Sequence, residues 1–328
     1  MLALICLAPA LAAAHHSGLY DNDRVVTIEG TITRIDWINP HVRLMIEADS
    51  EAGSAETWEV EGTSVNALER WGIARDRFSI GDRVTVQGPA SRFGRRAMIG
   101  ATARMPDGRQ VVLWPNVAAR LGLAETGVTG LFPPPAAAAT RQGQGIFRVW
   151  TPRGRPRGQA LPLTDAAREM VSEYNALEDD PALRCIPPGM PVMLDTPYPI
   201  EFVDQGDRIL MRFEEWDALR TIHMTPRNGS AAGEPSPKGE SFGRWEDATL
   251  AIFTTHINYP YFDDLGTPQS TDVTVLERYT LNDAETRLDW EVTVTDPQTF
   301  TAPIERRGYL AYEPGEVIKA FNCTLPPG

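Results

Sequence analysis

Three of the five histidines in the chain lie near its N-terminus, where they could bind a metal ion together. His15 and His16 are adjacent, and His41 follows in the triplet Asn39-Pro40-His41. Imidazole nitrogen is a preferred ligand of copper and zinc, so this set predicts a copper or zinc site. The alternative is that the triplet forms a turn around a polar, partly buried His41.

A second group with chemical potential combines aromatic and ionisable side chains in residues 254–264. His256 and Asp263 are predicted to act there as an acid/base pair, provided that the fold brings them within hydrogen-bond distance. The alternative is a structural loop that packs aromatic side chains such as Tyr259 and Tyr261 onto the rest of the domain.

Charged residues inside strand-like stretches form a third group. Arg220 and Glu277 both lie in such stretches. An unpaired charge inside a protein is costly, so we expect these two residues to form an internal pair or to bind a ligand. The residues expected to line a ligand site in this part of the chain are Arg220, Trp245, Asn258, Tyr259, Tyr261 and Glu277.

Composition and the absence of common motifs exclude several classes of function. The 328 residues carry a formal net charge of −13, and no basic surface dominates, which argues against nucleic-acid binding. The sequence contains no phosphate-binding glycine loop and no dinucleotide-binding fingerprint. Beyond the N-terminus, no apolar run reaches the roughly 20 residues needed to span a bilayer.

Residues 1–14, MLALICLAPALAAA, have the apolar core and the small-residue end of a secretory signal peptide. The alternative is a buried N-terminal helix. Cleavage after Ala14 would make His15 the first residue, and its α-amine could then bind a metal ion together with its imidazole. The segment predicts a periplasmic or secreted protein.

The number of cysteines is consistent with export to an oxidising compartment. Removal of a signal peptide takes Cys6 away and leaves Cys185 and Cys323. An even number of cysteines in an exported protein predicts a disulfide, here between Cys185 and Cys323. Two free, buried thiols are the alternative.

The elements that must position these groups are mostly strands. Within residues 15–113, apolar side chains such as Val26, Ile28 and Ile32 alternate with polar ones, which is typical of half-buried strands. A short helix is expected over residues 64–71. Five strands with a helix between the third and the fourth predict an OB-like β-barrel domain.

The remainder of the chain changes character twice. Residues 114–162 are rich in Pro, Ala and Arg and predict a linker. Its five arginines between residues 141 and 157 are either solvated or in contact with the acidic C-terminal half. Residues 163–328 begin with a helix capped by Thr164. About seven or eight mostly antiparallel strands follow from Ile200 onward and predict a second barrel or a sandwich.

Two sets of motifs resemble known protein groups. The stretches His15-His16-Ser17 and Trp37-Ile38-Asn39-Pro40-His41 resemble an uncharacterised bacterial secreted family, domain-of-unknown-function family 6152, over roughly residues 15–112. Arg184-Cys185-Ile186-Pro187-Pro188-Gly189 and Gly243-Arg244-Trp245-Glu246 resemble a second group of secreted proteins. That second resemblance implies a lipocalin-like barrel. Neither group implies an established reaction.

Together these observations predict an all-β protein with few short helices, formed by an OB-like five-stranded barrel and a lipocalin-like antiparallel barrel. The leading expectation for its function is binding of a small apolar or amphipathic ligand in the C-terminal barrel, because barrels of about eight strands can enclose one such molecule. The alternatives are acid/base or lyase-type catalysis in the same cavity, and copper or zinc binding through His15, His16 and His41.

Overall fold

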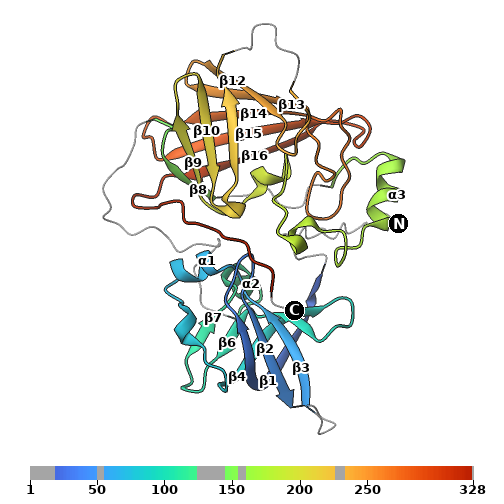
Figure 1. Ribbon diagram of the computed structural model, residues 1–328, viewed down its shortest axis with the longest axis vertical. Coiled ribbons are helices and arrows are strands. Elements are labelled where there is room, and N and C mark those ends of the chain that lie inside the picture. Colours follow the sequence, from blue (N-terminus) through green and yellow to red (C-terminus); the bar gives the residue numbers. More distant parts are fainter. Residues whose placement is uncertain (1–18, 50–54, 124–144, 154–159, 226–232, 327–328) are drawn as a thin grey trace, which may run out of the picture.

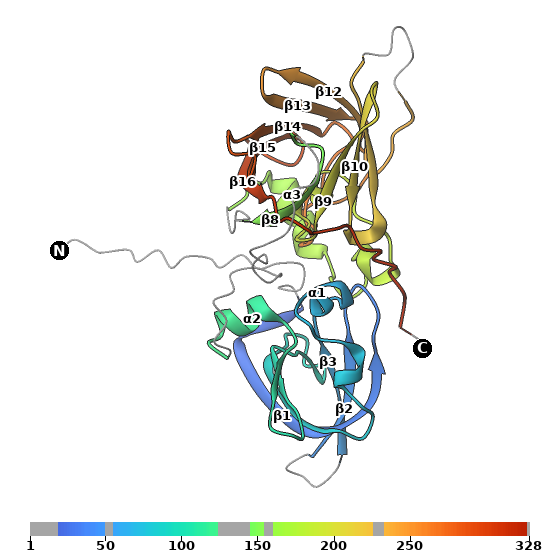
Figure 2. The same cartoon turned by 90° about the vertical axis from the view of Figure 1, so that its left-hand side faces the viewer.

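The structure is a computed structural model that describes residues 19–49, 55–123, 145–153, 160–225 and 233–326. It contains two β-barrels, one above the other in Figure 1, with the C-terminal segment (residues 312–326) running between them. The side view in Figure 2 shows the same order, with helix α1 of the first barrel facing the second. No helix in the described ranges is long and apolar enough to cross a membrane.

The N-terminal barrel closes through five strands. Its ring order is β1-β2-β3-β5-β4, and β4 pairs back onto β1. All pairs in the ring are antiparallel except β3 with β5. The strands of this domain are β1 (Tyr20–Asp36), β2 (Arg43–Asp49), β3 (Ala55–Glu61), β4 (Arg83–Ser91), β5 (Ala97–Ile99), β6 (Thr102–Arg104) and β7 (Gln110–Val112). The closed ring, with a helix between β3 and β4, confirms the expected OB-like barrel.

Gly30 is required where strand β1 pairs with two neighbouring strands, β2 and β4. Gly30 is paired with Ala48 of β2 and with Val84 of β4. A Cβ atom at this position would lie 2.3 Å from the carbonyl oxygen of Glu47, so any other residue would push the strands apart.

Two short helices accompany this barrel. Helix α1 (Val65–Arg70) begins where Ser64 Oγ accepts a hydrogen bond of 3.0 Å from the backbone N–H of Ala67, which confirms the expected helix. Helix α2 (Pro115–Arg120) starts with a proline in its first turn. A 3-10 turn, η1 (Arg75–Arg77), leads from α1 towards β4.

The C-terminal barrel closes through nine strands in the order β10-β11-β12-β13-β14-β15-β16-β8-β9. Only the β11–β12 pair is parallel among the pairs described. The strands are β8 (Val149–Arg153), β9 (Ile200–Asp204), β10 (Arg208–Phe213), β11 (Leu219–His223), β12 (Glu240–Glu246), β13 (Thr249–Thr255), β14 (Thr274–Leu281), β15 (Arg287–Thr295) and β16 (Ile304–Ala311). The expected closed β-barrel is confirmed, with nine strands in place of seven or eight.

The extra strand, β8, comes from the stretch that the sequence predicts to be a linker. Its Trp150 is fully buried in the barrel core, so the burial of one large aromatic side chain outweighs the Pro- and Arg-rich composition around it. Two of the arginines in this stretch also contact the acidic C-terminal half, Arg148 through Glu285 and Arg153 through Glu313.

Short helical elements connect strands of the C-terminal barrel. Helix α3 (Asp165–Glu173) begins at Thr164, whose Oγ1 accepts a 3.2 Å hydrogen bond from the N–H of Ala167, as expected. The 3-10 turns η2 (Pro181–Arg184) and η3 (Val192–Asp195) precede β9, and η4 (Glu215–Asp217) links β10 to β11.

Candidate functional site

A groove of about 330 Å³ opens on the surface of the N-terminal domain. It lies where the end of α1 meets the β6–β7 hairpin and the start of α2. Its volume falls in the range typical of small-molecule sites. The lining residues are Trp71, Gly72, Ile73, Arg77, Met105, Arg109, Gln110, Val111, Val112 and Pro115.

Local sequence signals shape both walls of this groove. On one side, Gly72 has a φ of +70° and turns the chain sharply after α1, which brings Ile73 to the groove. On the other side, Gly108 has a φ of +82° in the tight turn between β6 and β7. The Asp107 carboxylate accepts a 3.0 Å hydrogen bond from the N–H of Arg109 and fixes that turn.

The groove combines an apolar floor with cationic groups at its rim. Met105 and Pro115 are buried, and Val111 and Val112 are half-buried. Arg109 forms an ion pair with Asp107. Arg77 is exposed, and within the part of the chain that the structure describes no hydrogen bond or ion pair engages its guanidinium group. An apolar surface beside such a cation suits a molecule with an apolar body and an anionic head.

The sequence pattern did not indicate these groove residues. Two features of the sequence could have indicated them. Trp71 and Ile73 are apolar residues beyond the end of the helix, and Val111 and Val112 are consecutive apolar residues after the turn at Pro106-Asp107-Gly108. Apolar side chains at such positions cannot pack within their own helix or strand, so they pack against another element or line a groove.

The predicted metal ligands are only partly within the described residues. His15 and His16 lie outside them. The His41 ring stacks on Trp114, with centroids 5.2 Å apart and planes inclined by 19°. Its Nδ1 lies 3.2 Å from the carbonyl oxygen of Gly62 and 3.7 Å from Oε1 of Glu61. His41 is therefore partly buried in a polar cluster next to the bend at Pro40.

Arg220 and Glu277 form the predicted internal pair in the C-terminal barrel. Nη2 of Arg220 donates to Oε1 of Glu277 at 2.6 Å, and Nη1 donates to Oε2 at 2.9 Å. Ser241 and Thr254 accept further hydrogen bonds from Arg220, and the Tyr279 hydroxyl donates to Glu277 at 3.0 Å. Both charged side chains are almost fully buried, and each has several partners.

The barrel interior described here is largely filled by side chains. A core of aromatic and aliphatic residues runs through it, including Phe202, Met211 and Leu250. The cavity beneath Tyr279 and Trp290 measures about 20 Å³, which is room for about one water molecule. A ligand larger than a water molecule would therefore need movement of core side chains to enter this cavity.

The predicted acid/base pair is not brought together. The ring of His256 contacts the Thr255 hydroxyl at 2.8 Å. The Asp263 carboxylate accepts hydrogen bonds from the N–H groups of Leu265 and Thr267 and from the Thr267 hydroxyl. Burial raises the pKa of Asp263 even though these bonds oppose the shift. No hydrogen bond or ion pair joins the two predicted residues in the described ranges, so Asp263 serves its own loop.

The remaining predicted ligand residues are dispersed around the barrel. Tyr261 packs edge-on against Tyr174, with centroids 5.3 Å apart, and Tyr259 packs against Tyr261 at 6.3 Å. Asn258 is exposed. Trp245 is 46 % exposed and contacts Phe147 instead of the tyrosines. None of these side chains lines the three cavities found in the described residues, and the two tyrosines pack against other aromatic rings.

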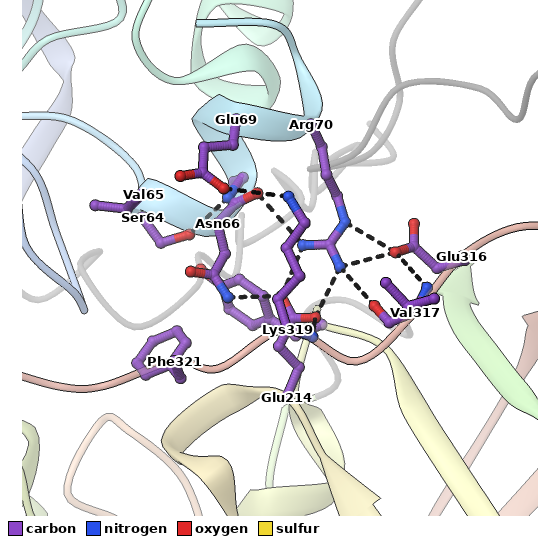
Figure 3. A network of polar contacts seen from close by, with 12 residues as sticks. Ser64, Val65, Asn66, Glu69, Arg70, Glu214, Glu316, Val317, Lys319 and Phe321 are labelled. Atoms are coloured by element: carbon purple, nitrogen blue, oxygen red, sulfur yellow. Dashed lines mark hydrogen bonds and ion pairs between the residues drawn. The ribbon is translucent and has the colours of Figure 1, made fainter. Parts of the chain in front are cut away.

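The two barrels are joined by a polar network around α1 (Figure 3). The buried carboxylate of Glu214 accepts two hydrogen bonds of 2.7 Å from Nη1 and Nη2 of Arg70. Asn66 Nδ2 and the backbone N–H of Lys319 donate to the same carboxylate at 2.9 Å. Arg70 also donates to Glu316 at 2.8 Å. One carboxylate is thus held by α1 and by the C-terminal segment.

Asn39 connects the motif Trp37-Ile38-Asn39-Pro40-His41 to the same interface. Its Oδ1 accepts a 2.9 Å hydrogen bond from the N–H of Val65, and its Nδ2 donates to Oδ1 of Asn66 at 2.9 Å. Its carbonyl oxygen accepts from the N–H of Thr324 at 2.9 Å. Part of the motif therefore holds the C-terminal segment, a role that the sequence alone did not reveal.

We expect Arg70→Met to lower the free energy of unfolding by about 2–3 kcal/mol, because it removes two charge-assisted hydrogen bonds from a buried carboxylate. Glu214 keeps its bonds from Asn66 and Lys319, which limits the loss. Urea denaturation measures the change. Lys319→Met is the matched control, because the Lys319–Glu69 pair is exposed and should contribute less than about 1 kcal/mol. Equal effects of the two substitutions would contradict this account of the interface.

A comparison with family models found a match to the N-terminal part of the chain. Residues 3–100 match the model of a family described as a family of unknown function, DUF6152. A comparison with curated proteins found no match. The resemblance of the C-terminal part to secreted lipocalin-like proteins stays a prediction. The N-terminal barrel, from β1 through β5, is therefore the part of this chain that is similar to the DUF6152 family.

Proposed function

We propose that this protein binds a small amphipathic anion, such as a medium-chain carboxylate, in the groove of its N-terminal domain. The observation that carries the proposal is the exposed guanidinium of Arg77 beside the apolar surface formed by Ile73, Val111 and Met105. Burial of each methylene group of the ligand contributes about 0.8 kcal/mol, and the cation orients its head group.

The proposal narrows the small apolar or amphipathic ligand expected from the sequence to an amphipathic anion, and it moves the binding site from the C-terminal barrel to the groove. The cavity beneath Tyr279 and Trp290 has room for about one water molecule, whereas the groove measures about 330 Å³. Binding in the groove requires no rearrangement of core side chains, and a preformed site avoids that cost. In this proposal the C-terminal barrel, for which we propose a lipocalin-like fold, supports the N-terminal domain through the interface at α1.

The proposed setting is the periplasm or the extracellular medium, after removal of residues 1–14. Support for this setting comes from the disulfide between Cys185 and Cys323, because disulfides persist in oxidising compartments. In such a compartment the protein would carry or sequester amphipathic anions.

Isothermal titration of the full chain with decanoate tests the proposal. We expect one molecule bound per chain. Ile73→Asp places a carboxylate in the apolar part of the groove and should abolish detectable binding. Arg77→Gln should weaken binding about 3- to 10-fold at low salt, and by less at high salt, because the contact is exposed and screened.

The control for Arg77→Gln is Arg96→Gln, which makes the same change of charge at an exposed position outside the groove. We expect its affinity to match that of the unaltered protein. Thermal unfolding of each variant establishes that it is folded. Unchanged binding by Ile73→Asp would overturn the proposal, and equal losses for Arg77→Gln and Arg96→Gln would show that net charge, not the groove, governs binding.

A further inference from the structure

The groove of the N-terminal domain carries a cationic side chain on each of its two walls. Arg77 ends η1 on the side of α1, and Arg109 lies on the other side, directly before β7. The apolar side chains of Ile73, Met105 and Val111 line the same groove. A ligand with one anionic head needs only one of these cations. Two cations beside one apolar surface therefore suit an apolar chain with an anion at each end.

The guanidinium group of Arg109 keeps donors that a second anion can use. Its Nε donates to the carboxylate of Asp107. Its Nη1 and Nη2 groups carry two N–H donors each, and they make no hydrogen bond in the described ranges. The side chain is 63 % exposed. A carboxylate in the groove can therefore accept hydrogen bonds from Nη1 and Nη2 while Nε stays on Asp107.

Asp107 both orients Arg109 and offsets its charge. The carboxylate accepts hydrogen bonds from the backbone N–H of Arg109, at 3.0 Å, and from its Nε. These two bonds hold the pKa of Asp107 below its usual value, so the carboxylate is charged at neutral pH. Asp107 is not among the residues that line the groove, and it acts on a ligand only through its charge. That charge opposes the approach of a second anion to Arg109.

We propose that the groove prefers aliphatic α,ω-dicarboxylates to monocarboxylates of the same length. Arg77 binds one carboxylate, Arg109 binds the other, and Asp107 limits the strength of the second contact. This inference rests on the proposed function, which supplies the first contact and the apolar surface. Without a cation on the second wall, the dicarboxylate would bind more weakly, because a charge replaces a methyl group beside apolar side chains. A preference for the dicarboxylate therefore reports on Arg109.

The test is calorimetric titration of the full chain with decanoate and with decanedioate. We expect decanedioate to bind about 3- to 5-fold more tightly at low salt, and the ratio to fall towards one at high salt, because both arginines are exposed. Arg109→Gln should abolish this preference. Asp107→Asn should increase the affinity for decanedioate a further 2- to 3-fold, roughly the effect of one exposed charge, because asparagine keeps the turn but removes the opposing charge.

Asp289→Asn is the matched control for Asp107→Asn. Asp289 forms an exposed pair with Arg287, also two positions away in the chain, but lies on β15 in the other barrel, so we expect the preference of the unaltered protein. Thermal unfolding of each variant establishes that it is folded.

The possible results separate this inference from the proposed function. If decanoate binds in the groove and decanedioate binds equally or more weakly, the inference is overturned and the proposed function stands. A preference for decanedioate that survives in folded Arg109→Gln also overturns the inference, because Arg109 is then not the second contact. If neither ligand binds, the proposed function fails and the inference fails with it.

Discussion

Reduction of the Cys185–Cys323 disulfide is expected to lower the free energy of unfolding by about 4–5 kcal/mol, the loop-entropy value for a bridge of this span. The two cysteines are 138 positions apart and are bonded in the structure, as the sequence predicts. The bridge anchors the C-terminal segment, and Asn39 contacts the same segment at Phe321 and Thr324. Loss of the disulfide therefore increases the conformational entropy of the unfolded chain, and it also removes a restraint on the C-terminal segment at the interface between the barrels.

Guanidinium denaturation with and without dithiothreitol measures this effect. The variant with both Cys185→Ser and Cys323→Ser is the control, because its stability should match that of the reduced protein and should not respond to the reductant. Coincident denaturation curves for the oxidised and the reduced protein would show that the bridge does not constrain the unfolded chain.

Replacing Arg220 with methionine is expected to destabilise the protein by about 3–5 kcal/mol, because it leaves the charge of Glu277 buried without its partner. Glu277 is 0 % exposed and would keep only the hydrogen bond from Tyr279. The expected loss exceeds that for Arg70→Met, since Glu214 at the interface keeps two other donors. Urea denaturation gives the free energy of unfolding.

Two further variants distinguish the effect of the buried Arg220–Glu277 pair from the general effect of removing an arginine. Arg212→Met removes an exposed pair with Glu201 and should cost no more than about 1 kcal/mol. The double variant Arg220→Met and Glu277→Leu should recover much of the lost stability, because replacement of a whole buried pair by apolar groups is often neutral. If the double variant is as unstable as Arg220→Met alone, the uncompensated charge of Glu277 is not the cause of the lost stability.

The sequence predicts the fold correctly at positions where the residue type strongly prefers one local structure, such as a strand or a helix cap. Alternation of Ile28 and Ile32 with polar neighbours predicts β1, and Ser64 and Thr164 mark the starts of two helices. The pair of Arg220 with Glu277 also followed, because strands that alternate towards a core would bury both charges. In these cases short-range pattern and tertiary structure agree.

Other features could not be predicted because they depend on distant partners. Strand β8 forms because Trp150 fills the barrel, which no local pattern in a Pro- and Arg-rich stretch indicates. Glu61 follows Val60 in a strand whose alternation points to an exposed position, yet it is buried between His41 and Tyr20. The groove likewise arises only when α1 and the β6–β7 hairpin meet.

The most direct test of the proposed function is the mapping of amide chemical shifts of the full chain as decanoate is added. The account predicts saturable shifts at Ile73, Val111 and Val112, with the residues of the C-terminal barrel unchanged. Shifts concentrated at Tyr279 and Trp290 would place the ligand inside that barrel instead and would contradict the groove as the binding site, and so would the absence of any saturable shift.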